Sequence, residues 1–271
     1  MARSGGLLAR KRCLLVGGTG GLGRAAARRF LEEGARVVVA GPEPDLGARA
    51  VAELGALGPL AFVPCDATRP EQVERLFRES TGILEGLDVL YHLAGASGRR
   101  AGDGPLHECS DDGWRHTLDV NLTSTFLTNR AAVRHFLASS QPGVILNMAS
   151  ALALAPAPAH FDTCAYSAAK GGVIALSRLA AARYAPVGIR VNVLAPGLID
   201  TPMAGRAVGD PAVRAYLRGK QPLGPGPGRP QDCADAAVFL CGDAARLVTG
   251  VVLPVDAGWC VREGGAGEGV Q

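Results

Sequence analysis

Short apolar runs recur along the chain and alternate with longer amphipathic stretches. The apolar runs occupy residues 14–16, 36–40, 60–63, 89–93, 144–148, 191–194 and 251–255. The stretches between them place apolar residues three and four positions apart, as at Val173, Leu176 and Ala180, which is the period of a helix. Because strands that are apolar throughout need cover on both faces, the pattern predicts an α/β fold. We expect a doubly wound parallel sheet of about seven strands with helices on both faces.

The length and composition favour one large domain. The chain has 271 residues, of which 48% are hydrophobic and 20% are charged, enough to bury an extensive core. Since no boundary interrupts the apolar runs, we expect a single domain over 1–271, with flexible ends at 1–10 and 263–271. Residues 198–229 are rich in glycine and proline and follow a predicted strand, where a substrate loop or lid belongs.

Charge and cysteine usage exclude several classes of protein. A formal net charge of +3 is too small for a dedicated nucleic-acid or membrane-surface binder, and no apolar run approaches the roughly 20 residues of a spanning helix. The seven cysteines contain no C-x-x-C pair, and their odd number does not suggest a disulfide framework. We therefore expect a soluble protein of a reducing, cytoplasmic compartment. No zinc-ligand spacing is present, and we predict no metal site.

A glycine-rich turn follows the first apolar run and leads into a helix-forming stretch. It reads Gly17-Gly18-Thr19-Gly20-Gly21-Leu22-Gly23. Such a turn lets backbone approach a pyrophosphate closely, while free N–H groups at the helix end stabilise its charge. A mononucleotide P-loop is excluded because Arg24 and Ala25 stand where that motif needs lysine and a hydroxyl. The turn predicts dinucleotide binding, and its spacing admits two glycine registers, starting at Gly17 or Gly18.

The end of the second predicted strand bears on the choice of dinucleotide. The sequence there is Gly41-Pro42-Glu43-Pro44-Asp45, which offers neither the usual acid for the NAD ribose nor a basic residue for the NADP phosphate. Glu43 and Asp45 would repel a ribose phosphate. Of NAD and NADP, the sequence thus favours NAD.

Tyr166 and Lys170 stand one helical turn apart, downstream of the glycine turn. A tyrosine of pKa about 10 is a poor proton shuttle at neutral pH, and a fixed cation lowers that pKa by favouring phenolate. Lys170 is one of only three lysines beside 25 arginines, so a lysine at this position is unexpected unless its chemistry is needed.

Taken together, these motifs resemble the short-chain dehydrogenase/reductase superfamily, over about residues 11–260. The family's T-G-x-x-x-G-x-G turn matches residues 16–23, with Val16 in place of the usual threonine, and this match selects the register that starts at Gly17. The resemblance implies a Rossmann-like fold and an NAD(P)-dependent oxidoreductase that moves hydride between nicotinamide and a secondary alcohol or ketone. It also implies a homotetramer or dimer, with contacts around residues 111–138 and 166–184.

The resemblance assigns roles to individual residues. Ser150 would bind the substrate oxygen, Tyr166 would exchange its proton, Lys170 would tune Tyr166 and bind the nicotinamide ribose, and Asn121 would anchor a proton-relay water. The expected cofactor contacts are Gly17, Thr19, Gly20, Gly21, Leu22, Gly23, Gly41, Asp66, Ala67, Ala94, Gly95, Tyr166, Lys170, Pro196, Gly197, Ile199 and Thr201. Read without the family, Asp66 is a loop cap and Asn121 a buried amide.

Two departures from the family pattern concern the site. His92-Leu93 replaces the usual Asn-Asn before Ala94-Gly95, so the bracing between sheet and cofactor changes. Three extra residues separate Ser150 from Tyr166, and we expect the segment 151–164 to reshape the substrate pocket. His160 in that segment is a further acid/base candidate.

The substrate stays open beyond an alcohol or ketone. The arginine-bearing residues 97–100 suit either an oxygen-rich or anionic substrate or a plain solvated loop. Two other functions fit the same residues: a non-catalytic NAD(P)-binding subunit or sensor, and a dehydratase or epimerase working through a transient keto intermediate. We expect a small-molecule partner and neither nucleic acid nor membrane.

Overall fold

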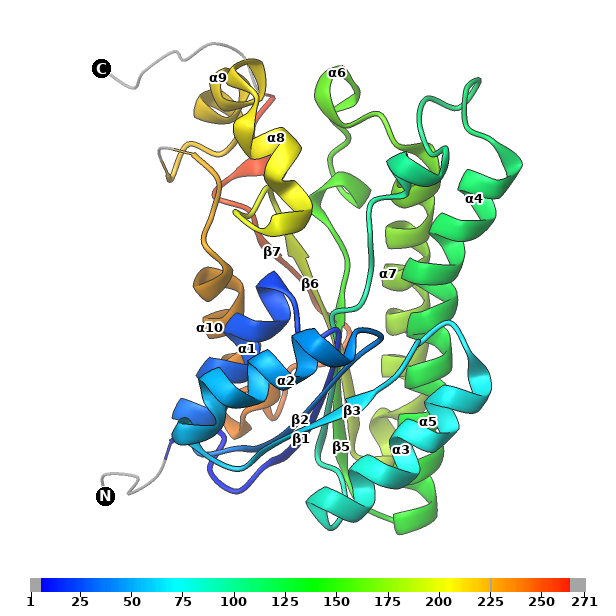
Figure 1. The fold of residues 1–271 in the computed structure, drawn as a ribbon, viewed down its shortest axis with the longest axis vertical. Coiled ribbons are helices and arrows are strands. Elements are labelled where there is room, and N and C mark those ends of the chain that lie inside the picture. The colour runs from blue at the N-terminus through cyan, green and yellow to red at the C-terminus, as the bar shows by residue number, and fades with distance from the viewer. Residues whose placement is uncertain (1–5, 225, 264–271) are drawn as a thin grey trace.

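The computed structural model describes residues 6–224 and 226–263, which form a parallel sheet covered by helices on both faces (Figure 1). The strands are β1 (Arg12–Val16), β2 (Arg36–Gly41), β3 (Leu60–Pro64), β4 (Val89–His92), β5 (Gly143–Met148), β6 (Ile189–Pro196) and β7 (Val252–Val255). The helices are α1 (Gly21–Glu32), α2 (Pro44–Leu54), α3 (Pro70–Leu84), α4 (Asp111–Leu118), α5 (Ser124–Ser139), α6 (Pro158–Phe161), α7 (Cys164–Tyr184), α8 (Gly205–Gly209), α9 (Pro211–Lys220) and α10 (Pro230–Cys241).

The strand order confirms the predicted doubly wound fold. The sheet runs β3-β2-β1-β4-β5-β6-β7, and every pair is parallel. The chain therefore reverses direction across the sheet between β1 and β4, which is the switch point where open α/β sheets bind ligands. All seven apolar runs form strands because each is long enough to cross the sheet and too short for a helix.

Alternate residues of each strand enter two separate cores. On β1, Leu15 packs with α1 and α10 on one face, while Leu14 packs with α3, α5 and α7 on the other, and both are fully buried. Figure 1 shows these two helical layers on either side of the sheet. Burial on both faces explains why the strand sequences are continuously apolar.

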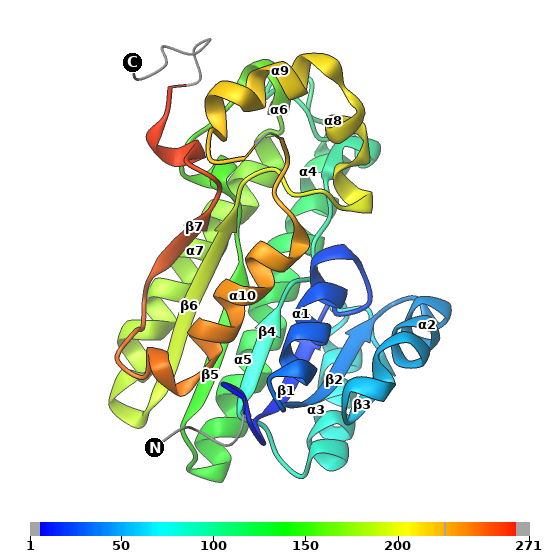
Figure 2. The ribbon, with the colours of Figure 1, turned by 90° about the vertical axis from the view of Figure 1, so that its left-hand side faces the viewer.

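A smaller apolar cluster lies above the carboxyl ends of the strands, where α6, α8 and α9 gather in Figures 1 and 2. Its centre is Trp259, whose indole donates a hydrogen bond to the Ala155 carbonyl at 2.9 Å. Val213 and Leu217 of α9 pack into the same cluster. The segments 151–164 and 198–229 are thus joined by a common core at the end of the sheet where the glycine turn lies.

Part of the amino-terminal segment expected to be flexible, residues 6–10, is packed against the domain. Leu8 is fully buried, and its amide donates to the Glu33 carbonyl at 3.1 Å. Two leucines in a short basic lead-in gave no sign of this anchor. The remainder of the expectation, at 1–5 and 264–271, lies outside the described residues. Within the described chain, no helix combines the length and apolarity needed to cross a bilayer.

Candidate active site

The glycine turn between β1 and α1 is built by close backbone approaches. Gly17 has φ +86°, and a Cβ on it would lie 2.6 Å from the Ala94 amide nitrogen. A Cβ on Gly23 would collide with the Gly17 carbonyl oxygen. Both positions therefore require glycine, and the requirement fits the register that starts at Gly17.

The same turn leaves the amino end of α1 open. Gly20 is the N-cap of α1, no side chain caps this end, and a Cβ on Gly20 would meet nothing within 4 Å. Free N–H groups at a helix start are suited to a phosphate. The residues present accordingly fit the pyrophosphate of a dinucleotide.

Asn121 sits in a π-helical turn, Asp119–Thr123, that joins α4 to α5. Its amide nitrogen donates to the carbonyls of Thr117 and Ala96, each at 2.9 Å. Its Oδ1 is buried and has no hydrogen-bond partner within the described residues. Since a buried acceptor without a partner is costly, this oxygen marks a site for a further polar group.

Gly95 separates Asn121 from Lys170. A Cβ on Gly95 would lie 2.6 Å from the Asn121 Oδ1 and 3.1 Å from the Lys170 Nζ. The Asn121 Oδ1 and the Lys170 Nζ therefore both lie on the side of Gly95 that a side chain would occupy. The small residue keeps the asparagine and the ammonium accessible to one space.

Ser150, Tyr166 and Lys170 come together at the carboxyl ends of β5 and the start of α7. Ser150 follows β5, is buried, and forms a side-chain hydrogen bond with Tyr166. Lys170 is buried one turn after Tyr166 and donates to the Met148 carbonyl at 3.0 Å, with Nζ 5.6 Å from the centre of the Tyr166 ring. The three extra residues within segment 151–164 therefore do not separate Ser150 from Tyr166 and Lys170.

The acidities of these groups are set by burial. Burial raises the pKa of Tyr166 to about 12, while the hydrogen bond with Ser150 lowers it less. Burial lowers the pKa of Lys170 to about 8. The effect expected of Lys170 on the Tyr166 pKa stays a prediction, since the shift here comes from burial and from the Ser150 hydrogen bond, while Lys170 donates to Met148.

Asp103 fixes the start of α7 from a distant part of the chain. Its Oδ1 accepts the Ala165 amide and its Oδ2 accepts the Tyr166 amide, both at 3.0 Å. The carboxylate is buried and meets the positive end of the helix. Asp103 thereby holds the backbone of Tyr166, a residue 63 positions later in the sequence.

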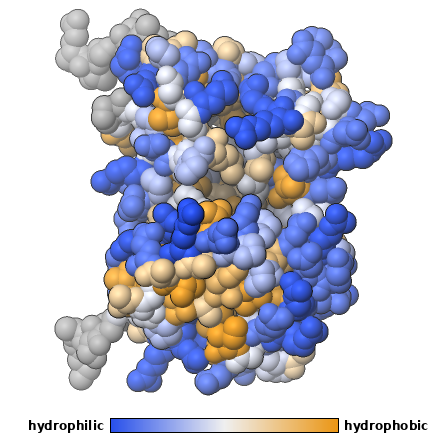
Figure 3. Space-filling model, in the orientation of Figure 1, coloured by the Kyte–Doolittle hydropathy of each residue, from blue (hydrophilic) through white to orange (hydrophobic). Residues whose placement is uncertain are grey.

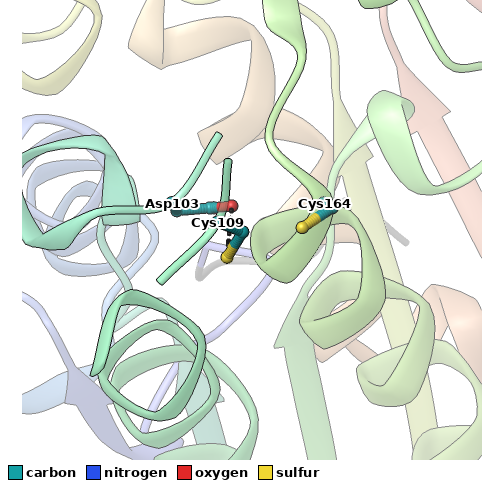
Figure 4. A group of neighbouring side chains, drawn as sticks. All are labelled: Asp103, Cys109 and Cys164. Carbon is teal, nitrogen blue, oxygen red and sulfur yellow. Dashed lines mark hydrogen bonds between the residues drawn. The ribbon is translucent and has the colours of Figure 1, made fainter. Parts of the chain in front are cut away.

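Cys109 and Cys164 lie beside this carboxylate, as Figure 4 shows, with the sulfur and oxygen atoms of the three residues within 4.8 Å of one another. Such a group has the ligand types of a metal site. Both Asp103 oxygens already accept backbone hydrogen bonds, however, and burial raises the pKa of Cys164 to about 11, which disfavours the thiolate that binds metals. The geometry is that of a helix cap.

A pocket of about 210 Å³ opens beside Tyr166. Figure 3 shows the surface hollowed between α8 and the α1–α2 region. The expected site residues that line it are Leu22, Gly95, Ser150, Tyr166, Lys170, Pro196, Gly197, Ile199 and Thr201. The expected residues outside its lining are Gly17, Thr19, Gly20, Gly21, Gly23, Gly41, Asp66, Ala67, Ala94 and Asn121. The pocket thus unites the reactive groups with the residues expected beside the nicotinamide.

The residues expected at the adenosine end lie around the carboxyl ends of β2 and β3. Thr19 is buried beside Gly41, and a Cβ on Gly41 would lie 2.7 Å from the Oγ1 of Thr19. Asp66 accepts hydrogen bonds from the amide and hydroxyl of Thr68, at 2.9 and 2.7 Å. Asp66 therefore caps its own loop, a role that needs no ligand.

His92 takes a structural position behind the site. Its ring nitrogens meet the hydroxyls of Thr128, at 2.9 Å, and Ser124, at 3.3 Å, both on α5. Burial lowers the pKa of His92 to about 3, so the ring is neutral at physiological pH. The histidine therefore braces β4 against α5.

One large pocket residue was not found from the sequence. Trp259 lines the pocket from a short helical turn whose placement depends on tertiary packing. Met203 and Arg206 also line it, and they belong to the segment 198–229 expected to form a substrate loop. His160, expected as an acid/base candidate, is not in the pocket lining and packs against Tyr216 at 4.7 Å between ring centres.

Comparisons with known proteins agree with this geometry. Residues 17–260 match the family described as enoyl-(acyl carrier protein) reductase. A 3β-hydroxysteroid dehydrogenase of Eggerthella lenta is 38% identical over 258 residues, 94% of this chain and 95% of the relative. A cis-4-hydroxycyclohexanecarboxylate dehydrogenase of Sinomonas cyclohexanicum is 37% identical over 257 residues, 94% of this chain and 98% of the relative.

A solved structure shares the fold. A short-chain type dehydrogenase/reductase from Mycobacterium ulcerans superposes with a TM-score of 0.86 at 30% identity, covering 94% of this chain and 92% of the other. The similarity extends over nearly the whole chain.

Proposed function

The chain belongs to the short-chain dehydrogenase/reductase superfamily and is an NAD(P)-dependent alcohol dehydrogenase of the short-chain type; on this basis we propose that Tyr166 is its acid/base. The observation that carries the proposal is the convergence of Ser150, Tyr166 and Lys170 in one pocket. Tyr166 is the group in that lining that can exchange a proton with a substrate oxygen at the end of the sheet where the dinucleotide cradle lies.

The proton chemistry follows from the positions of these residues. Ser150 binds the substrate oxygen and orients it toward the Tyr166 hydroxyl. With its pKa raised to about 12, Tyr166 is protonated at neutral pH and is poised to donate in ketone reduction. Alcohol oxidation needs the phenolate, which a charged Lys170 favours once the phenol has begun to ionise.

The residues of the glycine turn and of the pocket both fit parts of a dinucleotide. We assign its pyrophosphate to the turn from Gly17 to Gly23 and its nicotinamide to the pocket side of Gly95, Pro196 and Thr201. When bound, it supplies or accepts the hydride of the reaction. Lys170 would hold the adjoining ribose, and the unpartnered Oδ1 of Asn121 would hold a water that passes protons to Lys170.

We propose NAD as the preferred dinucleotide. Arg24 and Arg28, on the helix that follows the glycine turn, both pair with Glu53, at 3.3 and 3.1 Å. Glu43 and Pro42 follow β2 without a basic side chain. Parallel fluorescence titrations are expected to give a dissociation constant for NADH about tenfold below that for NADPH, or about 1.4 kcal/mol. A tenfold preference for NADPH contradicts the assignment.

We propose a ring-borne secondary alcohol or the matching ketone as substrate. The relatives from Eggerthella lenta and Sinomonas cyclohexanicum are named for hydroxyls on a steroid and on a cyclohexane ring. In this chain Leu152, Phe161 and Trp259 line the pocket beside the reactive groups, and such side chains suit an apolar ring. Oxidation or reduction of a panel of cyclic alcohols and ketones, followed by cofactor absorbance, tests this assignment.

We propose that the chain acts as a homotetramer or dimer in the cytoplasm. Four large apolar side chains are exposed on the helices expected at the contacts: Trp114 on α4, Phe126 and Leu137 on α5, and Leu179 on α7, the last 70% exposed. Exposed apolar groups on adjoining helices suit a subunit interface. The seven free cysteines suit a reducing compartment. Sedimentation equilibrium tests the assembly.

A further inference from the structure

Two arginines line the pocket, and neither guanidinium has a hydrogen bond or ion pair within the described residues. Arg99 belongs to the short helical turn Gly98–Ala101 after β4, and Arg206 belongs to α8. Figure 1 shows the loop after β4 on the side of α4 and α8 on the side of α9. The two cations therefore approach one pocket from separate parts of the chain.

Many arginines of this chain are used differently. Arg12 pairs with Asp88 at 2.7 Å, Arg29 with Asp235 at 2.7 Å, and Arg229 with Asp232 at 2.9 Å. The two pocket arginines lack such a partner although Asp103 and Asp162 lie close enough to act on Arg99 electrostatically. Asp103 is already committed, since both its oxygens accept backbone amides.

The positive charges also act on each other. Burial and the neighbouring charge of Arg206 both lower the pKa of Arg99. Like charges held near one another are relieved by an anion between them, and guanidinium groups bind carboxylates through paired, charge-assisted hydrogen bonds. The side chains of both arginines are exposed, which places them at the mouth of the pocket and leaves them open to a ligand.

The rest of the pocket defines what such an anion is attached to. Apolar side chains make up much of the remaining lining, including Leu198, Met203 and Ala207. Ser150 and Tyr166 provide the hydroxyl-binding groups. The lining thus combines proton-exchanging groups, apolar side chains and two arginines without a charged partner.

We propose that the substrate is an anionic ring compound, a hydroxy or keto acid whose carboxylate is bound by Arg99 and Arg206 while its reacting oxygen meets Ser150 and Tyr166. This inference rests on the proposed function and adds the charged group to the substrate. The arginines act on binding and orientation, and no step of the proton or hydride chemistry involves them.

Kinetics on a matched pair of ketones test the proposal. The pair is 4-oxocyclohexanecarboxylate and its neutral methyl ester, assayed with wild type, Arg99→Gln, Arg206→Gln and the double variant. We expect wild type to prefer the acid, and each variant to raise the KM for the acid about tenfold while the ester is unaffected. Arg100→Gln is the matched control, because Arg100 is an adjacent, exposed arginine outside the pocket lining.

Equal use of the acid and the ester by wild type overturns the proposal, as does an equal effect of Arg100→Gln. Calorimetric titration with cyclohexanecarboxylate measures binding of the anion without turnover. It therefore distinguishes failure of the anion site from failure of the proposed function. If neither ketone is turned over, the proposed function is contradicted, and the anion site is then decided by binding alone. Binding to wild type that the double variant loses supports the site, and no binding to wild type overturns it.

Discussion

The Asp103 carboxylate accepts the backbone N–H of Tyr166 at 3.0 Å. The bond joins the loop after β4 to the first turn of α7, and a second bond to the Ala165 amide makes the contact two-pronged. The orientation of the proposed acid/base therefore depends on a residue that no local motif reveals. Asp103 acts on the site by positioning Tyr166 through its backbone.

Replacing Asp103 tests this positioning role. Asp103→Ala removes both acceptors at the start of α7, and we expect a loss of about 1–3 kcal/mol in unfolding free energy. We also expect kcat to fall by more than the KM for NADH rises, because Tyr166 loses its alignment while the cradle stays intact. Urea unfolding and steady-state kinetics measure the two effects.

Asp232→Ala is the matched control for that experiment. Asp232 accepts the Arg229 amide at 2.8 Å in the capping box of α10, away from the pocket lining. The control should lose stability but retain kcat. If the two variants lower kcat equally, Asp103 contributes stability alone.

A methyl group at Gly95 is expected to disturb the groups behind the site. Gly95→Ala places a Cβ against the Asn121 Oδ1 and the Lys170 Nζ. Because small displacements of positioned groups cost large factors in rate, we expect kcat to fall by about tenfold or more. Gly104→Ala is the control, since a Cβ there meets nothing within 4 Å. Unchanged turnover in Gly95→Ala would mean that neither polar group contributes to the rate.

His92 is expected to make the fold sensitive to acid. Its pKa is about 3 in the folded chain and about 6.5 when unfolded. As pH falls below about 6.5 the unfolded chain binds a proton that the folded chain does not, so stability declines until pH nears 3. Between pH 7 and pH 5 this one group should remove about 2 kcal/mol.

His92→Asn tests that linkage by comparing pH profiles, since the substitution itself also changes packing. Urea unfolding at pH 7, 6 and 5 should show a shallower decline for the variant than for wild type. The exposed His107, replaced by Asn, serves as a control and should follow the wild-type profile. Parallel profiles for all three proteins would show that His92 does not titrate differently on folding.

The sequence predicted the sheet because each strand carries its own signal. Residues 36–40, for example, are apolar enough to identify β2 without knowledge of its neighbours, and burial on both faces explains their composition. The glycine turn and the spacing of Tyr166 and Lys170 are likewise local, so they were found directly.

Features that depend on distant contacts were not accessible in this way. Asp103 meets Tyr166 only after the chain has folded, and Leu8 is anchored by residues near Glu33. The burial that raises the pKa of Tyr166 was likewise not predicted. Spacing along a helix gives the neighbour of a group but not its solvation.

The central claim is that Tyr166 exchanges the proton of the reaction. Tyr166→Phe keeps the ring and removes the hydroxyl, so NADH binding and unfolding free energy should stay close to wild type. General acid/base catalysis contributes about 10² to 10⁴ in rate, and we expect kcat for reduction of a cyclic ketone to fall by that factor. Turnover by Tyr166→Phe within a few-fold of wild type, with cofactor still consumed, would contradict the account.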